Sequence, residues 1–347
     1  MEAVGRTSPV AERSLAVLAT GAVLAFGWLA RELLLPTALA VFVAFTVQPL
    51  VRWLERRRLP RWAAAALGTL VATAVVAVLA IVLYDAISGI WEELPAYEDK
   101  LRAALGKVSR TAKQVEAQTD AVVKQPGTVK LHAGVPWGML LLGTAQGALA
   151  IAAEATVAVF ALYFALAEGP RYRQKLLASL DPDGRRHADA ALGEVHRDVE
   201  QYMVNRVLLN AALGLVTWGA YALYGLEHAS LWGLTTALLH FVPYVGPAAG
   251  LALPALMALL QYGALKDVLL VSGIYVALVA LQGNVIDPVF LGKQLRLSSL
   301  AVFLGSLFWF WIWGPIGLFL AVPLLSTIRI ACAHTPRLHF VARFLAE

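Results

Sequence analysis

Apolar stretches long enough to cross a membrane alternate with short polar connections along most of this chain. The first two, Leu15–Ala30 and Leu33–Val51, are separated only by Arg31 and Glu32, which predicts a tight turn between two spans. A third span is predicted at Trp62–Tyr84. Because a lipid-spanning helix needs about 20 consecutive apolar residues, the pattern predicts an all-α polytopic membrane protein with about eight membrane segments.

The one long polar stretch, residues 85–136, has a different periodicity. Its apolar residues recur at alternating steps of three and four from Leu94 to Val122, which predicts an amphipathic helix. That helix either lies against the membrane domain or mediates self-association. Gln125-Pro-Gly127 predicts its end.

Two segments in the last third of the chain share one plan. Residues 241–254 and 310–323 each run from aromatic residues through Gly-Pro and a further Gly to an apolar half-helix ending in Pro. Because each arm is short for a crossing, each pair fits a re-entrant or broken helical hairpin, and two kinked full spans are the alternative. The predicted hairpin tips contain Pro243, Gly246, Pro247, Gly314, Pro315 and Gly317.

Charge placement predicts how the chain is oriented. Five arginines between Arg52 and Arg61 mark a connection on the cytoplasmic side, and Arg329, Arg337 and Arg343 favour a cytoplasmic C-terminus. The N-terminus is then also cytoplasmic. We expect four parts: N-terminal spans in 1–84, an extracytoplasmic amphipathic helical segment in 85–136, a span with a cytoplasmic helix in 137–206, and a C-terminal core with both hairpins in 207–347.

Composition narrows the classes of function. The chain is 59% hydrophobic and only 15% charged, which suits a protein whose solvent is mostly lipid. Its net charge of +5 lies in short clusters between apolar stretches, so we expect no nucleic-acid partner. The single Cys332 excludes an internal disulfide and a Cys-based zinc site. Without hydrolase, metalloprotease or nucleotide-binding motifs, we expect neither an enzyme nor a cofactor.

Polar residues inside apolar surroundings are the candidates for chemistry. Gln282, Asn284 and Asp287 form the most polar cluster between two apolar elements and can bind a cation, relay a proton or hydrogen-bond a polyhydroxylated solute. The alternative is a surface loop in which Asp287 caps a helix and pairs with Lys293. Glu154 is the only acid deep in a long apolar stretch, which makes it a candidate for the solute or ion pathway unless it is a paired structural residue.

His240 lies next to the first hairpin tip and can titrate near neutral pH, although a lone histidine there is also consistent with a structural role. Trp309, Trp311 and Trp313 fit an interfacial aromatic belt. They can alternatively stack on a ring-shaped solute.

Several of these motifs resemble the AI-2E family of transporters, also called the autoinducer-2 exporter or PerM-like family. The resemblance rests on Phe241-Val-Pro-Tyr-Val-Gly-Pro247, on Gly283-Asn-Val-Ile-Asp-Pro288 and on residues 313–323. It implies a homo-oligomeric protein of a bacterial inner membrane. Two positions depart from the family pattern: Met203 follows Tyr202 where Gly-Gln is common, and Asp287 stands where Glu is common.

The resemblance and the residues leave three hypotheses for function. The first is a secondary transporter that exports a small polar solute such as autoinducer-2 by alternating access. The second is a monovalent cation/proton antiporter, for Na⁺ or Li⁺, that uses Asp287 and Glu154. The third is a non-transporting oligomeric scaffold organised by the amphipathic helix.

Overall fold

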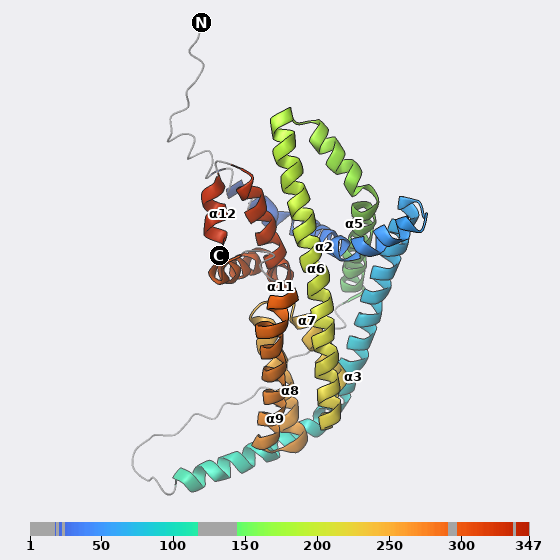
Figure 1. Cartoon of the computed structure of the whole chain (residues 1–347). Helices are drawn as coiled ribbons and strands as arrows, with labels where there is room; N and C mark the ends of the chain where they lie inside the picture. Colours follow the sequence, from blue (N-terminus) through green and yellow to red (C-terminus); the bar gives the residue numbers. More distant parts are fainter. Residues whose placement is uncertain are drawn as a thin grey trace. The chain divides into compact units, whose positions relative to one another are not determined.

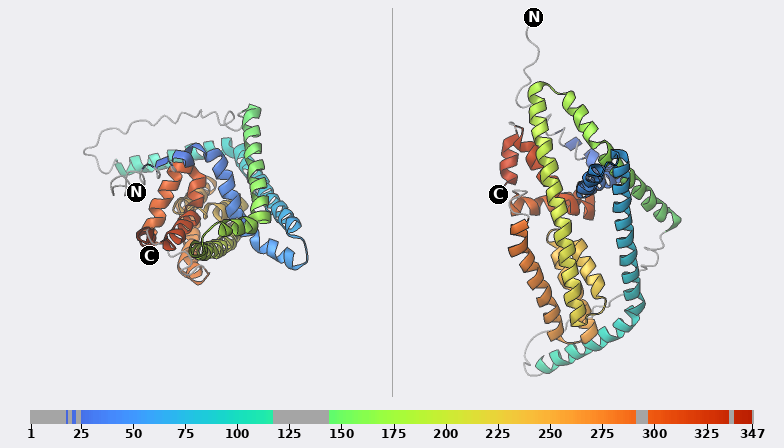
Figure 2. Two further views of the ribbon diagram at one scale, coloured as in Figure 1. Left: turned by 90° about the horizontal axis from the view of Figure 1, so that it is seen from above. Right: turned by 45° about the vertical axis from the view of Figure 1, so that its right-hand side comes forward.

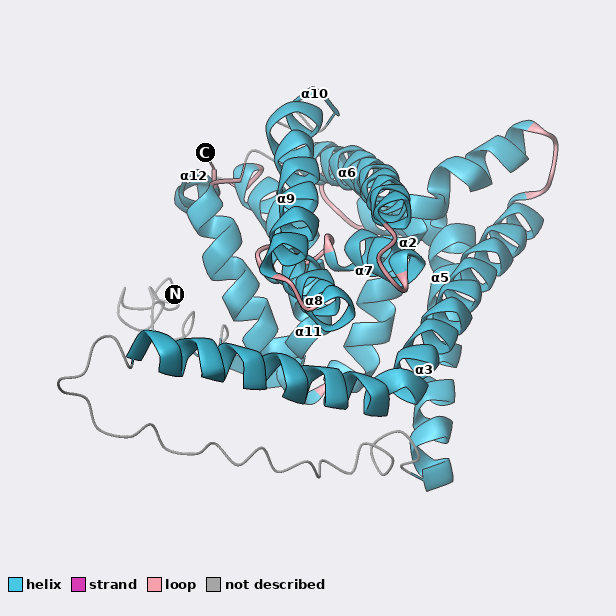
Figure 3. Ribbon diagram, turned by 90° about the horizontal axis from the view of Figure 1, so that it is seen from below, coloured by secondary structure: helices cyan, strands magenta, loops and turns pink. Residues whose placement is uncertain are grey.

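The computed structural model confirms an all-α protein within the residues that it describes. These are residues 18, 21, 22, 25–116, 144–290, 297–335 and 338–346, and side chains between 90 and 151 are not among them. Every regular element in these residues is a helix (Figure 3). The first predicted span lies partly outside these residues, and the predicted helix end at Gln125 lies wholly outside them.

Seven of the described helices are long and apolar enough to cross a membrane, which confirms the polytopic prediction. These candidate spans are Arg31–Arg56, Arg61–Gly89, Ala152–Ala178, Pro182–Tyr224, Val245–Tyr262, Leu265–Phe290 and Ser299–Ala333. An eighth apolar helix, Ala229–Leu239, is shorter. The predicted break at Arg31 and Glu32 is found one residue earlier, since Ala30 forms the turn before the helix that begins at Arg31.

The sequence predicted a cytoplasmic helix that ends by residue 206 and a separate C-terminal core that begins at 207, but one helix, α6 (Pro182–Tyr224), runs through this boundary. It is a single uninterrupted helix in the right-hand view of Figure 2. Its start follows from the predicted turn, because the Asp181 carboxylate accepts a hydrogen bond from the Gly184 amide at 3.3 Å and proline suits the first helical position. Polarity changes at Arg206, yet no residue there breaks a helix.

The chain divides into two compact units. The first comprises Met1–Thr73, Ala153–Asn205 and Lys293–Glu347, and the second comprises Ala74–Ala152 and Arg206–Gly292. The helices α3 (Arg61–Glu116) and α6 each contribute residues to both units. Each unit contains one of the two segments with the Gly-Pro plan.

The first unit is built from α2 (Arg31–Arg56), the start of α3, α5 (Thr144–Ala178) from Ala153 onward, the first part of α6, α11 (Ser299–Ala333) and α12 (His339–Leu345). Small residues let its helices approach closely. A Cβ atom on Gly68 of α3 would lie 2.9 Å from the Val51 side chain of α2, so only glycine fits there. Leu162 and Leu166 of α5 are buried in the same core.

The helix α11 is a hairpin rather than a straight rod. Its backbone leaves helical geometry at Gly314, where φ is 62°. A Cβ atom on Gly305 would lie 2.4 Å from the Leu325 side chain, although 20 residues of straight helix would separate them by about 30 Å. The two arms therefore fold back on each other (Figure 2, orange to red), and Gly317 at the tip has no room for a Cβ atom beside the Trp309 carbonyl oxygen, 2.1 Å away.

The second unit contains the other hairpin, formed by α7 (Ala229–Leu239) and α8 (Val245–Tyr262). It also contains α9 (Leu265–Leu281), a π-helical turn (Gln282–Ile286) and α10 (Asp287–Phe290). The helices α8 and α9 lie side by side (Figure 1). Tyr221, Trp232 and Tyr275 are among the large side chains of its core.

The tip of the α7–α8 hairpin is tight. A Cβ atom on Gly246 would lie 1.9 Å from the Leu239 carbonyl oxygen, and Tyr244 has a φ of 62°. With 11 residues, α7 is about 16 Å long, roughly half of a hydrocarbon core of about 30 Å. Both predicted hairpins are therefore present as folded-back helix pairs.

Candidate functional site

An ion pair connects α6 with the first residue of α10, which directly follows the π-helical turn of the second unit. The Arg206 guanidinium donates to Asp287 Oδ2 at 3.2 Å and to the His240 carbonyl oxygen at 3.1 Å. The second contact fits the helix dipole, because the carbonyl groups at the C-terminus of α7 carry partial negative charge. Both charged side chains are mostly buried. Arg206 thus connects α6, the tip of the α7–α8 hairpin and Asp287.

The turn that precedes Asp287 has unusual geometry. The sequence predicted a polar connection from Gln282 onward, but Gln282–Ile286 is a π-helix that continues into α10. An extra residue in one turn re-aims the side chains that follow, and π-helical turns are frequent at functional sites. Asp287 therefore pairs with Arg206 from a helix and not from a surface loop. Lys293, its alternative predicted partner, lies outside the described residues.

The second unit, which contains this ion pair, also has buried polar groups whose hydrogen bonds are unmade within the described part of the chain. The unsatisfied atoms are both amide atoms of Asn210 and of Gln282, His240 Nε2, Tyr275 Oη, Thr217 Oγ1 and Thr236 Oγ1. Each of these side chains is at most 4% exposed. An unmade hydrogen bond on a buried group costs about 1–3 kcal/mol, so such a concentration in one unit calls for a functional explanation. We call Arg206, Asn210, Thr236, His240, Tyr275, Gln282 and Asp287 the polar cluster.

Helical periodicity places the polar cluster on facing surfaces. Arg206, Asn210 and Thr217 recur on α6 at steps of four and seven, which is one face of a helix. Gly214 lies on this helix between Asn210 and Thr217, and a Cβ atom there would be 2.6 Å from the Gly233 carbonyl oxygen of α7. The two backbones therefore approach closely where the polar face of α6 meets the hairpin.

Tyr275 of α9 reaches the same hairpin. Its ring lies edge to face with that of His240, with centroids 6.0 Å apart. A Cβ atom on Gly250 of α8 would lie 2.1 Å from the tyrosine hydroxyl oxygen, so glycine makes room for the Tyr275 side chain. The hairpin thus contacts the polar faces of both neighbouring helices.

Comparison with known proteins identifies the family. A family model described as AI-2E family transporter matches residues 15–337. The chain belongs to this family. The AI-2 transport protein TqsA of Escherichia coli (strain K12) is 28% identical over 319 residues, which cover 92% of this chain and 90% of TqsA. YhhT of the same strain is 27% identical over 307 residues, 87% of this chain and 84% of YhhT. This AI-2E family member is therefore a multi-pass membrane transporter.

The structure brings together three of the five predicted pathway residues of this AI-2E protein: Asp287, Gln282 and His240, all in the second unit. Asn284 is not among them, because it is exposed and its amide donates to the Ala280 carbonyl oxygen of its own helix at 2.9 Å. Glu154 belongs to the first unit and is exposed on α5, so no contact of the described chain assigns it a role.

Sequence reasoning missed Arg206, Asn210, Thr236 and Tyr275. Arg206 was counted as the last residue of a cytoplasmic helix, and Asn210 lay unremarked in an apolar stretch. The signal was present, since a four-residue step from Arg206 to Asn210 on an apolar helix marks one polar face.

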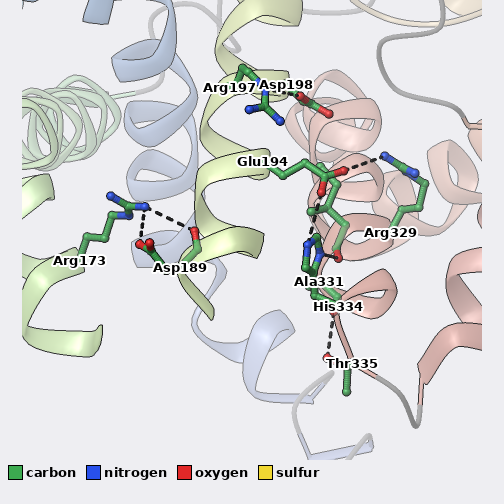
Figure 4. Close-up of polar contacts among 10 residues, drawn as sticks. Arg173, Asp189, Glu194, Arg197, Asp198, Arg329, Ala331, His334 and Thr335 are labelled. Atoms are coloured by element: carbon green, nitrogen blue, oxygen red, sulfur yellow. Dashed lines mark hydrogen bonds and ion pairs between the residues drawn. The ribbon is translucent and has the colours of Figure 1, made fainter. Parts of the chain in front are cut away.

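The first unit has its own buried charges. Arg329 on the second arm of α11 is 8% exposed, and its guanidinium lies 4.0 Å from Glu194 of α6. Glu194 lies between Arg329 and His334, whose Nε2 is 3.5 Å from the same carboxylate (Figure 4). Glu194 therefore links α6 to α11 through its contacts with Arg329 and His334. Within the described residues, no three His, Cys, Asp or Glu side chains are grouped so that they could hold a metal ion.

Proposed function

We propose that this AI-2E family member is a secondary transporter that exports a small, uncharged, polyhydroxylated solute such as autoinducer-2 across the bacterial inner membrane. The observation that carries the proposal is the polar cluster, with its buried amide and hydroxyl groups whose hydrogen bonds are unmade among the described residues. The printed name of its relative TqsA, an AI-2 transport protein, points to the same class of solute.

The chemistry of the polar cluster favours a neutral solute. Asn210 and Gln282 each offer amide donors and an amide acceptor, which is what a solute hydroxyl needs in order to donate and accept. The positive charge of Arg206 is balanced by Asp287, so the cluster has no excess charge for an anion or a cation. A site with buried hydrogen-bonding groups also discriminates strongly against analogues that lack the matching hydroxyl.

The contacts of Arg206 suggest how access alternates. One guanidinium holds both the carbonyl end of α7 and the Asp287 carboxylate, so the tip of the α7–α8 hairpin cannot swing away without breaking these bonds. We propose that the hairpin is the moving gate and that solute binding in the polar cluster offsets the loss of these contacts. The two positions of the gate would open the site to opposite sides of the membrane. The basic segment Arg52–Arg61 supports cytoplasmic termini.

Monovalent cation/proton antiport is the second candidate, and one observation favours it. Asp287 Oδ1 has no hydrogen-bond partner within the described chain, so the carboxylate retains one free oxygen for a cation. In that mechanism a cation would compete with Arg206 for Asp287. A sodium-triggered proton flux that is lost in Asp287→Asn is expected for this candidate alone.

The decisive experiment compares both fluxes in proteoliposomes of the purified protein. Labelled autoinducer-2 uptake is measured alongside the response of an internal pH dye to added sodium. We expect solute flux in the wild type, and at least a tenfold reduction in Gln282→Leu, about the loss of one to two hydrogen bonds to a buried polar group. Asn284→Leu is the matched control, because that amide is exposed and bonded to its own helix. Solute flux that is equal in both variants would contradict the assigned site.

A further inference from the structure

The first unit contains a cavity of about 710 Å³ that shares no residue with the polar cluster. It is lined by four helices: α2, the start of α3, α5 and α6. The volume falls within the range of about 300–1,000 Å³ that is typical of small-molecule sites. None of its lining residues belongs to the polar cluster, so the proposed solute site does not account for it.

The lining combines apolar and polar side chains on the same helices. On α2 it includes Val41 and Phe45 together with Gln48, and on α5 it includes Ala165 and Leu176 on either side of Arg173. The Phe45 ring lies against that of His196, with centroids 5.5 Å apart, so apolar and polar groups share the cavity wall.

Three basic side chains contribute to the lining, namely those of Arg61, Arg173 and His196, and no Asp or Glu is among the described residues that line it. Each has a carboxylate partner outside the lining, at 3.3 Å for Arg61, 2.6 Å for Arg173 and 3.3 Å for His196. Arg61 is also held in place by the Leu166 and Ala167 carbonyl oxygens, to which it donates at 2.9 and 3.0 Å. The Arg173 side chain is 47% exposed, so its guanidinium can share a second anion besides Asp189.

Exposed tryptophans place the Arg61 side of the cavity near a membrane surface. Trp53 and Trp62 flank the turn between α2 and α3 and are 49% and 66% exposed. Tryptophan side chains are enriched at the level of lipid head groups. Because Arg61 lines the cavity and belongs to the same turn, this side of the cavity lies at the depth of lipid phosphates.

We propose that this cavity binds one anionic phospholipid, with the phosphate at Arg173 and an acyl chain along Val41, Phe45 and Ala165. Basic pockets between membrane helices recognise acidic head groups in this way. A neutral detergent would gain nothing from the arginines, and a zwitterionic lipid would gain less than an anionic one, because its ammonium group offsets the phosphate charge. A carboxylate-bearing protein segment would lack a match for the apolar lining.

The test is native mass spectrometry of the purified full-length protein, titrated with dioleoyl phosphatidylglycerol or dioleoyl phosphatidylcholine. We expect phosphatidylglycerol to bind first and more tightly. Arg173→Gln is expected to weaken its binding about fivefold, the loss of one basic residue at an anionic lipid surface. Arg186→Gln is the matched control, because Arg186 is exposed, pairs with Asp183 three residues away and does not line the cavity.

A second variant tests the cavity itself. A Cβ atom on Gly169 meets nothing within 4 Å, so Gly169→Leu fills the space without a clash. It should abolish the tight phosphatidylglycerol site, while Gly219→Leu, at an equally open position outside the cavity, should not. Equal affinities for the two lipids, or unchanged binding in Gly169→Leu, would overturn the proposal. So would a change of oligomeric mass in Gly169→Leu without lipid loss, which would make the cavity a contact between copies.

Discussion

Replacing Asn210 with leucine should show separately how much the buried amide destabilises the folded protein and how much it contributes to transport. Asn210 is 1% exposed, and neither amide atom has a hydrogen-bond partner within the described residues. Leucine has a similar volume and no polar atoms, so the folded state no longer carries the penalty of two unmade bonds. Each such bond costs about 1–3 kcal/mol, and an apolar residue of the same shape is neutral or stabilising. We therefore expect Asn210→Leu to raise the Tm of the purified protein or leave it unchanged.

The same substitution should damage transport. A solute hydroxyl that bonded Asn210 would now be buried against methyl groups, which costs about 1–3 kcal/mol and corresponds to a loss of flux of about 5- to 150-fold at low solute concentration. Flux of labelled autoinducer-2 into proteoliposomes and the Tm in detergent are measured on the same preparation. A variant with normal flux, or one with a clearly lower Tm, would refute the reasoning, because the amide would then be either unused or already satisfied.

Further expectations concern the ion pair and the hairpin tip. Arg206→Ala should lower the Tm more than the double variant Arg206→Ala/Asp287→Ala, because the single change leaves a mostly buried carboxylate without its counter-charge, and thermal unfolding of both variants checks the order. Gly246→Ala should lower both the Tm and the flux, since its Cβ atom would overlap the Leu239 carbonyl oxygen, whereas Gly273→Ala, with nothing within 4 Å, should leave both unchanged. A Gly246→Ala protein with the wild-type Tm would contradict the packing described at the tip.

The hairpins were predictable from sequence because their cause is local. Gly314 and Gly246 mark backbone positions that no other residue occupies comfortably, and such positions are visible in a single chain. The continuity of α6 was not predictable in the same way. A change from mixed charge to apolar residues at Arg206 signals a change of environment, and a helix can pass through such a change without a break in its hydrogen bonds.

The polar cluster was only partly predictable because its members meet through tertiary packing. Asp287 and Gln282 lay in an obvious polar motif, but the motif also contained Asn284, and one helical step decides which amide is buried. The π-helical turn changes the angular spacing between these side chains, and no residue pattern in Gln282–Ile286 predicts it. The role of Asn210 could not be predicted from the sequence alone. A single amide on an apolar helix becomes a site candidate only once Arg206, one helical turn away, is known to pair with Asp287.

The two Gly-Pro hairpins share a plan in sequence, but they differ in what surrounds them. The α7–α8 hairpin lies against buried amides of α6 and the π-helical turn and against the Arg206–Asp287 ion pair, whereas the buried polar groups of the α11 hairpin include its own Ser306 and Ser326 hydroxyls. The glycines and prolines themselves supply no hydrogen-bonding side chain, so the tip cannot specify a solute. It follows that solute specificity within this family should track residues such as Asn210 and Gln282 on the neighbouring helices, while the Gly-Pro tips govern whether the gate forms at all. Exchanging these two amides should therefore change which solute is carried, and altering Gly246 should reduce transport of every solute alike.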